Sequence, residues 1–362
     1  MAKRKPAKAK RRKPARARQP RRDPLAEFGA AIGQDGHAQS LTLADDVLSK
    51  VKTWISTGSL ALDRLMAGKG VPCGRVTEMY GPNHIGKSTL LDHMFAECQR
   101  MGGYGILLDI EGARDEAYTQ SIGVDISRLS VLEFDRAHLV MEEVVDKIFD
   151  SIDFWYREFP DVPIVIGWDA LGSTRTRDEA NKSMGEDPIV AAAASVMRRA
   201  CRAIMPHVGG TNIALVVCNH SYTQVQTSGG VQRQVTYAGE ALRHAATFRL
   251  KLRSAYPNQW IKSTDGIILG RQIIINVEKN RFGNPWNEAR VALMSGHGID
   301  NVWSVYEELK ARGFITTSGS WSAINLDGEV LKFQGWNGLN AKIADDETLF
   351  PRLVSVYQQL EA

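Results

Sequence analysis

The nine residues GPNHIGKST, Gly81 to Thr89, constrain the fold of this chain more than any other stretch. They match the pattern G-x-x-x-x-G-K-[ST], in which glycines let backbone N–H groups turn toward the oxygens of a phosphate. An apolar run that favours a buried strand, RVTEMY, precedes them, and LLDHMFAEC follows with its apolar residues on one helical face. Strand, phosphate loop and helix in this order predict a nucleotide-binding α/β core.

The loop also predicts how a nucleoside triphosphate and its metal are held. Lys87 is expected to reach the β- and γ-phosphates, and the hydroxyl of Ser88 to coordinate Mg²⁺. The rest of the loop is expected to surround the phosphates, helped by the dipole of the following helix. The predicted nucleotide-binding residues are Gly81, Pro82, Asn83, His84, Ile85, Gly86, Lys87, Ser88 and Thr89.

Two carboxylates follow predicted strands and are candidates for metal and water. Asp169 ends the apolar run PIVIGWD (163–169), and Glu111 comes just after GILLDI (105–110). Ligands of doubly wound sheets bind at the carboxyl ends of the strands, so Asp169 is expected to hold Mg²⁺ directly or through water. Glu111 is expected to orient and deprotonate an attacking water. Helix capping or surface solvation remains an alternative for Asp109 and Glu111, because spacing alone does not decide.

The order of apolar runs predicts the architecture of the core. Strands expected at 75–80, 105–110, 163–169 and 212–219 alternate with helical patterns such as the amphipathic stretch 136–157. This alternation is typical of an α/β fold with a mostly parallel, twisted sheet and helices on both faces.

The second half of the chain follows a different pattern. From residue 246 the runs TFRLKLR, GRQIIINVEKNR and ARVALM favour sequential strands joined as hairpins. Residues 298–362 predict a small α+β domain with a helix, a strand pair and a final helix. Residues 220–238 are polar, contain glycine and have no clear period, which is typical of a long functional or disordered loop.

The N-terminal stretch has a composition unlike the rest. Residues 1–22 carry twelve Lys or Arg, no acid and three prolines, although the net charge of the whole chain is only +4. With almost nothing apolar larger than alanine, residues 1–23 are expected to be disordered. We expect this basic arm to contact nucleic-acid phosphates, and its deletion to weaken DNA binding most at moderate salt while leaving ATP binding intact. A solubility tail or a targeting segment remains the alternative.

Composition and cysteine usage favour a cytoplasmic protein. An apolar content of 43% is ordinary for a globular chain, and no apolar run has transmembrane length. The cysteines have no metal-ligand spacing and are expected to be reduced thiols in or near the core. They are Cys73, Cys98, Cys201 and Cys218.

Taken together, these segments resemble the RecA recombinase family. The stretch ISTGSLALDRLM and the following GVPCGRVTEMYGPNHIGKSTL are similar to the part of that family that leads into its phosphate loop. LLDIEGARDEAYTQSIGVD is similar to the segment after its second strand. The likeness runs from about residue 24 to near the C-terminus and is densest in 55–125 and 205–285.

The resemblance implies a function and single-residue roles. It implies ATP and Mg²⁺ as cofactors, helical filaments on single-stranded DNA, DNA-stimulated ATP hydrolysis, and pairing and strand exchange with homologous double-stranded DNA. Such a protein would act in recombination and repair in the cytoplasm, at a nucleoid or a phage replication site. Glu111 matches the carboxylate that activates water, and Asp169 the magnesium-side acid. Tyr118 matches an aromatic residue that stacks on adenine, with Asp115 beside it at the base edge.

Two basic residues in EKNRFGNPW match a pair of cations in the family. There, the residues that correspond to Lys279 and Arg281 cross the subunit interface to the γ-phosphate of a neighbour. Cations supplied by a neighbour make hydrolysis depend on assembly. Without the resemblance, two solvated charges on a turn would be the default interpretation.

For DNA, the family uses two loops and the helix between them, which here match 172–189, 220–239 and the Ala-rich stretch 191–205. Arg198 and Arg202 lie four apart, so on a helix they share a face and can bind adjacent phosphates. Aromatic platforms are sparse, so binding is expected to involve mainly the DNA backbone and to tolerate any sequence. Further candidates in the second loop are Gly229, Gly230, Arg233 and Gly239.

Three positions depart from the family pattern. Asn83 stands where bacterial members usually carry an acid, and Ala170 where a serine is common. His220 replaces an amide side chain, usually glutamine, that couples the γ-phosphate to the second DNA loop. Since histidine changes charge near neutral pH, we hypothesise that this coupling survives and becomes pH-sensitive between about pH 6 and 7.5. A neutral spacer histidine is the alternative.

The resemblance also suggests boundaries and leaves other functions open. We expect a basic arm at 1–23, an oligomerisation segment with one short helix at 24–55, an ATPase core at 56–297 and a small domain at 298–362. One alternative is a DNA-coating filament protein with a vestigial ATPase. Another is a hexameric helicase or branch-migration motor built on the same core, although the extra domains of those proteins are missing from this sequence.

Overall fold

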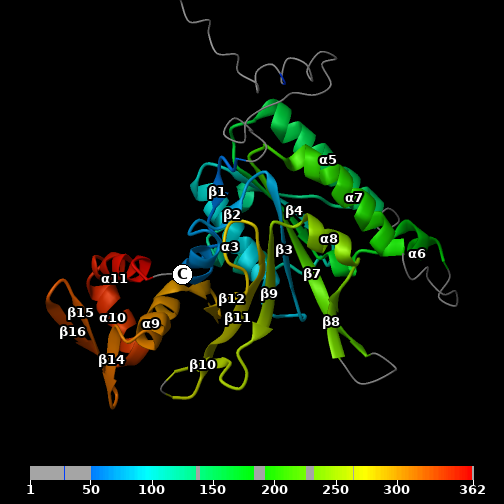
Figure 1. Cartoon of the computed structure of the whole chain (residues 1–362). Helices are drawn as coiled ribbons and strands as arrows, with labels where there is room; N and C mark the ends of the chain where they lie inside the picture. Colours follow the sequence, from blue (N-terminus) through cyan, green and yellow to red (C-terminus); the bar gives the residue numbers. More distant parts are fainter. Residues whose placement is uncertain are drawn as a thin grey trace, which may run out of the picture. The chain divides into compact units, whose positions relative to one another are not determined.

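A single large sheet organises the core of this chain (Figure 1). The computed structural model describes residue 28 and residues 50–135, 139–182, 192–225, 232–263 and 265–360. The predictions for the basic arm and for a helix at 24–33 therefore lie outside the described residues, apart from Phe28, whose backbone is helical. The residues from Lys50 onward form one compact unit.

The strand order is β13-β12-β11-β9-β3-β7-β6-β4-β5, with β8 paired to β7 and β10 to β11. From β9 across to β5 the neighbouring strands are parallel, and the strands from β11 to β13 are antiparallel. The mostly parallel core and the later hairpins agree with the sequence pattern. The strand bounds are β3 (Arg75–Gly81), β4 (Tyr104–Asp109), β5 (Leu129–Val131), β6 (Ile164–Asp169), β7 (Ile213–Val225), β8 (Gln232–Thr236), β9 (Phe248–Ser254), β10 (Trp260–Lys262), β11 (Ile268–Asn280), β12 (Asn287–Met294) and β13 (Gly298–Asp300).

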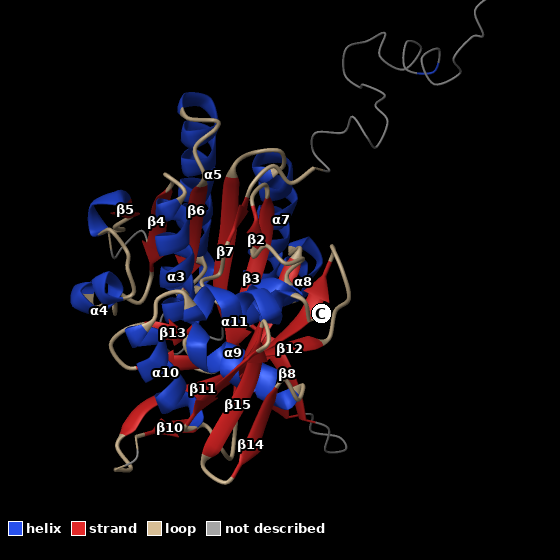
Figure 2. Cartoon of the chain, turned by 90° about the vertical axis from the view of Figure 1, so that its left-hand side faces the viewer, coloured by secondary structure: helices blue, strands red, loops and turns tan. Residues whose placement is uncertain are grey.

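Helices cover both faces of this sheet, as Figures 1 and 2 show. On one face α3 (Lys87–Arg100) packs its apolar side, including Leu91, Met94 and Phe95, against the sheet. On the other face α5 (Met141–Glu158) and α7 (Ala192–Val208) bury a second cluster around Trp168. Each helix has a stripe of apolar residues at helical spacing, and burying that stripe on the sheet stabilises both layers.

Short elements complete the core. Ser59 caps α2 through its hydroxyl, which accepts from the N–H of Leu62. The bounds are β1 (Trp54–Ile55), α2 (Leu60–Leu65), β2 (Val71–Pro72), α4 (Glu116–Ser121), η2 (Ile126–Arg128), η3 (Leu171–Ser173), α6 (Arg177–Asn181) and α8 (Glu240–Ala245). The four cysteines are buried and free, as expected. Within the described ranges, no helix is long and apolar enough to cross a membrane.

The C-terminal part carries more structure than its sequence pattern indicated. Instead of a strand pair, β14 (Ile315–Ser318), β15 (Trp321–Leu326) and β16 (Glu329–Phe333) form a three-stranded antiparallel sheet. Besides α9 (Asn301–Ala311) and α11 (Leu349–Gln358), a further helix, α10, spans Gly335–Asp345. Its two glycines have low helix propensity, so the local sequence does not predict this helix. Burial of Leu339 in the core of the C-terminal part stabilises it.

The polar stretch 220–238 is also more ordered than predicted. Strand β7 continues through it to Val225, and β8 pairs back antiparallel, so that Ser221 lies opposite Thr236. The expectation of a long loop was wrong for these residues, while 226–231 lie outside the described part. In a two-stranded ribbon the backbone N–H and C=O groups of one strand bond to those of the other. Such a ribbon therefore does not require alternating apolar residues in the sequence.

Candidate nucleotide and DNA site

The phosphate loop has the backbone that its glycines predict. It leaves β3 at Gly81 and enters α3 at Lys87, and Gly86 at the helix start has φ of +105°, in the region that favours glycine. Because α3 begins at Lys87, its free N–H groups and the positive end of its dipole point at this loop. Asn83 and His84 are exposed, and Ile85 is buried as an anchor in the core.

Lys87 is prepared for an anionic ligand. Its side chain is buried, and Nζ donates to the carbonyl oxygens of Pro82 at 2.9 Å and Gly81 at 3.3 Å. Burial lowers the pKa of this ammonium, and the nearby carboxylates of Asp169 and Glu111 oppose the shift. An ammonium has three donors, so phosphate oxygens fit here and would replace the water that burial removed.

Ser88 and Asp169 are the two residues predicted to hold Mg²⁺. Ser88 is exposed in the first turn of α3, and Asp169 ends β6 with only 6% of its surface exposed. Hydroxyl and carboxylate oxygens are the donors that Mg²⁺ prefers, and this ion usually keeps waters and takes further ligands from phosphates. In the described residues no group of three or more His, Cys, Asp or Glu could hold a metal by itself. The donor set therefore fits an ion that arrives with its nucleotide.

Glu111 lies just beyond β4 in a small hydrogen-bonded cluster. Its Oε1 accepts from the Ser173 hydroxyl at 2.7 Å and lies 3.0 Å from Nε2 of His220. Burial would raise the pKa of Glu111, but the bonds from Ser173 and His220 outweigh it and lower the pKa. The carboxylate is therefore ionised at neutral pH, and its two hydrogen bonds fix its orientation. A group that accepts a proton from water needs both properties.

The two residues assigned to adenine are not equivalent in the structure. Asp115 is the N-cap of α4, where Oδ1 accepts from the N–H of Tyr118 at 2.7 Å. One oxygen of this carboxylate is thus used for helix capping, whereas Asp109, at the end of β4, accepts from the Gly112 N–H in the following loop. Tyr118 is half-buried, and its hydroxyl lies 3.4 Å from Thr89 Oγ1. The ring thus borders the end of the phosphate loop.

Lys279 and Arg281 lie near the opposite end of the strands from the phosphate loop. Asn280, between them, pairs with Phe248, which pairs with Thr77 near the start of β3, whereas the loop follows the end of β3. Lys279 donates to the carbonyls of Arg243 and His244, both at 2.8 Å, and Arg281 donates to that of His244 at 3.0 Å. They therefore cap the C-terminus of α8 and do not face the loop of their own chain.

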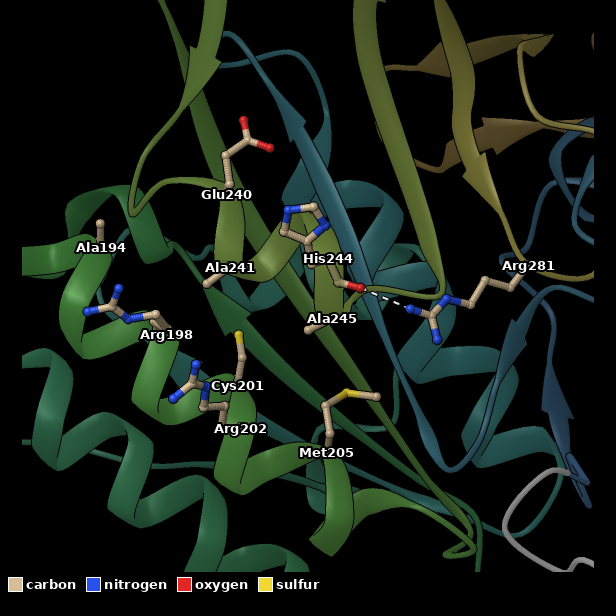
Figure 3. Close-up of a pocket in the computed structure, with 10 residues that line it drawn as sticks. All are labelled: Ala194, Arg198, Cys201, Arg202, Met205, Glu240, Ala241, His244, Ala245 and Arg281. Atoms are coloured by element: carbon tan, nitrogen blue, oxygen red, sulfur yellow. Dashed lines mark hydrogen bonds between the residues drawn. The ribbon is translucent and has the colours of Figure 1, made fainter.

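The predicted DNA arginines line a cavity close to these cations. Arg198 and Arg202 are exposed on one face of α7, and Figure 3 shows them across from α8 and Arg281. The cavity has a volume of about 640 Å³ and includes His244. In Figure 3 the guanidinium groups of Arg198 and Arg202 point away from α8, whereas that of Arg281 points toward it.

The remaining DNA candidates belong to the ribbon of β7 and β8. Gly229 and Gly230 lie outside the described residues. Arg233 lies on β8, where its backbone pairs with Gln224 of β7, and only its backbone is described. Gly239 has φ of +76° at the start of α8, and a Cβ there would lie 3.1 Å from Ala194. Backbone conformation and close packing therefore explain a glycine at this position without any contact to DNA.

Sequence reasoning missed three residues of the site. Ser173 bonds to Glu111, and Arg114 bridges Asp92 and Asp169. Asp92 could have been noticed as a lone charge on the apolar side of its helix, one turn after Ser88. Arg114 could have been noticed as the single basic residue in the acidic segment EGARDEA, but its spacing does not indicate which carboxylates it contacts.

Comparisons with known proteins identify the family of this chain. The model of the RecA N-terminal domain matches residues 30–300. Protein RecA of Desulforapulum autotrophicum is 32% identical over 301 residues, which cover 83% of this chain and 81% of that protein. Protein RecA of Synechococcus sp. strain CC9311 is 32% identical over 286 residues, 79% of this chain and 70% of that protein. Protein RecA of Crocosphaera subtropica is 31% identical over 292 residues, which cover 81% of this chain and 79% of that protein. The chain belongs to the RecA family of recombinases.

Proposed function

We propose that this chain is an ATP-dependent recombinase that forms helical filaments on single-stranded DNA and promotes pairing and strand exchange with homologous double-stranded DNA. Its hydrolysis of ATP would be stimulated by DNA. The observation that best supports this is the separation within one chain of the phosphate loop from Lys279 and Arg281: the loop follows the carboxyl end of β3, and the two cations lie near the other end of the strands. Only another copy can bring the two together, and a head-to-tail contact of this kind generates a filament or a ring.

In the proposed mechanism the chain positions both the phosphates and the attacking water. Lys87 and the N–H groups of the loop bind the phosphates, and Ser88 and Asp169 are placed to hold Mg²⁺, which would neutralise developing charge. Glu111 accepts the proton of the water, oriented by Ser173. Lys279 and Arg281 of the next copy stabilise the charge on the γ-phosphate, so that hydrolysis requires assembly.

We further propose that DNA lies along α7 and the ribbon of β7 and β8. His220 on β7 pairs with Gly81 of β3, so the ribbon continues directly from the strand beside the phosphate loop. Residues 24–55 would contribute to contact between copies, around an ATPase core of 56–297 and a small domain of 298–362. Phosphates gripped by Arg198 and Arg202 would leave the bases free to pair.

The first experiment is ATP hydrolysis with and without long single-stranded DNA, using Glu111→Gln as the control. We expect strong stimulation by DNA that the variant abolishes while it still binds ATP. DNA binding without hydrolysis in either protein would instead indicate a coating protein with a vestigial nucleotide site. Negative-stain images separate a helical filament from the ring of a hexameric motor.

A mixing experiment tests the contribution of the neighbour. Lys87→Ala and the double variant Lys279→Ala/Arg281→Ala should each be inactive alone. In an equal mixture, head-to-tail contacts would form complete sites at about a quarter of the interfaces, so about a quarter of the wild-type rate should return. A mixture as inactive as its components would argue against cations supplied by a neighbour.

A further inference from the structure

Arg114 connects three elements around the metal side of the site. Its Nη2 donates to Oδ2 of Asp169 at 3.0 Å, and its Nη1 forms an ion pair with Asp92. Asp92 lies on α3 one turn after Ser88, Asp169 ends β6, and Arg114 lies in the loop between β4 and α4. One guanidinium therefore ties the phosphate-loop helix, the end of β6 and the loop that carries Glu111.

This bridge is shielded from solvent. The side chains of Asp92, Asp169 and Arg114 are 3%, 9% and 13% exposed, and the guanidinium lies over the ring of Phe95. Asp92 is held in turn by the hydroxyl of Thr119 on α4. A planar guanidinium can donate to two carboxylates at fixed angles, so each partner limits the rotation of the others.

The charges in the bridge point to a role in positioning. Two carboxylates and one guanidinium carry a net charge of −1, which equals the charge of Asp169 alone. Arg114 and Asp92 therefore leave the charge offered to a cation unchanged, while they fix the carboxylate in place. The bond uses Oδ2 of Asp169, and a carboxylate has a second oxygen that can accept from a metal-bound water.

We propose that Arg114 is a positioning residue that orients the Asp169 carboxylate for Mg²⁺ bound with ATP, with Asp92 as its anchor. This inference rests on the proposed binding of Mg²⁺ and ATP. Groups that orient a metal ligand typically change metal affinity by about 10- to 100-fold when they are removed. The effect should therefore appear in the Mg²⁺ dependence of nucleotide binding, before any hydrolysis.

The test compares full-length variants by titrating Mg²⁺ against binding of a fluorescent ATP analogue, with thermal melting as a separate measure of folding. Asp92→Leu/Arg114→Leu removes the pair without leaving an unpaired charge between them. Arg114→Lys keeps the charge but cannot span both carboxylates, so it tests the same point if the double variant is unstable. Arg352→Lys is the matched control, because it makes the same substitution in an ion pair with Glu329 in the C-terminal small domain, away from the nucleotide site.

We expect the double variant to need about ten-fold more Mg²⁺ for half-maximal binding, Arg114→Lys to show a smaller shift, and Arg352→Lys to remain close to wild type. An unchanged Mg²⁺ dependence in both Arg114 variants, even with a lower melting temperature, would show a purely structural bridge and overturn the inference. A wild-type protein that binds no nucleotide at any Mg²⁺ concentration would overturn the proposed function together with it.

Discussion

Nε2 of His220 lies 3.0 Å from Oε1 of Glu111. His220 stands on β7 opposite Gly81, at the point where this strand leaves the core for the ribbon of β7 and β8. A single imidazole thus touches the carboxylate assigned to water and begins the segment assigned to DNA. Because a carboxylate only accepts, Nε2 carries the proton in this contact, and Ser173 Oγ lies 3.2 Å from the same nitrogen. The departure from glutamine places a titratable group at the centre of the proposed coupling.

The first prediction concerns the contact between His220 and Glu111. His220→Ala removes the donor at Nε2, so Glu111 keeps only the bond from Ser173, and DNA-stimulated hydrolysis should fall by about ten-fold. His220→Gln can supply an amide donor to the same carboxylate and should keep a rate near the wild-type value. Steady-state rates on single-stranded DNA check this. Equal rates in wild type and His220→Ala would show that the contact does not contribute to the coupling.

The second prediction concerns the alkaline side and Lys279. Burial, with the charges of Arg281, Arg249 and Arg243, lowers the pKa of Lys279 to about 8. The ammonium is charged below this pH and loses its proton above it, so DNA-stimulated hydrolysis should fall as pH rises through 8. Lys279→Arg, which stays protonated, should hold its rate to higher pH. Equal alkaline losses in both proteins would show that another group titrates.

The third prediction separates the faces of α7. Arg198 and Arg202 line the cavity, whereas the neighbouring Arg199 is exposed elsewhere on the helix. Each substitution of the first two by alanine should weaken single-stranded DNA binding and reduce the slope of log affinity against log salt by about 0.7. Arg199→Ala is the matched control and should leave the slope near the wild-type value. Fluorescence anisotropy over a salt series measures these slopes. Three variants with the same slope would refute this assignment.

The fourth prediction concerns stability in acid and His93. This imidazole is 7% exposed between α3 and β13, and Nε2 accepts from the N–H of Ile299 at 2.8 Å. Burial, with the charges of Arg100 and His297, lowers its pKa to about 4. The unfolded chain takes up a proton near pH 6.5 and the folded chain does not, so stability falls as pH drops from 6.5 to 4, by about 3 kcal/mol.

Urea unfolding across this pH range measures that effect. His93→Gln keeps an acceptor for Ile299 and removes the titration, so the loss between pH 6.5 and 4 should be smaller than in wild type by roughly this amount. The prediction fails if the two proteins lose the same free energy of unfolding over this range.

The fifth prediction concerns a buried ion pair in the sheet. Nε of Arg249 donates to Oε2 of Glu78 at 2.5 Å, and Glu78 is fully buried. Arg249→Met leaves this carboxylate without its cation and should cost about 3–5 kcal/mol in the free energy of unfolding. Glu78→Gln/Arg249→Met removes both charges and should recover much of the loss. A double variant no more stable than the single one would mean that packing, not charge, dominates here.

Several features of this protein follow from local sequence alone. The phosphate loop, the strand before it and the helix after it are encoded within about twenty consecutive residues, because glycine conformations and helix starts depend on near neighbours. Asp169 and Glu111 were identifiable because apolar strands end beside them and parallel strands present their carboxyl ends to ligands. The parallel core and the later hairpins follow from apolar runs in the same way.

Other features were decided by the tertiary structure. Three features join residues from distant segments: the pairing of Arg114 with Asp92 and Asp169, the contact of His220 with Glu111, and the placement of Lys279 at the end of the strands away from the phosphate loop. Such contacts depend on strand order and register, which residue spacing does not specify. The sequence pattern predicts a loop where β7 and β8 form a ribbon, for a related reason. The ribbon is stabilised by pairing between the two strands, and this pairing requires no alternation of apolar residues in the sequence.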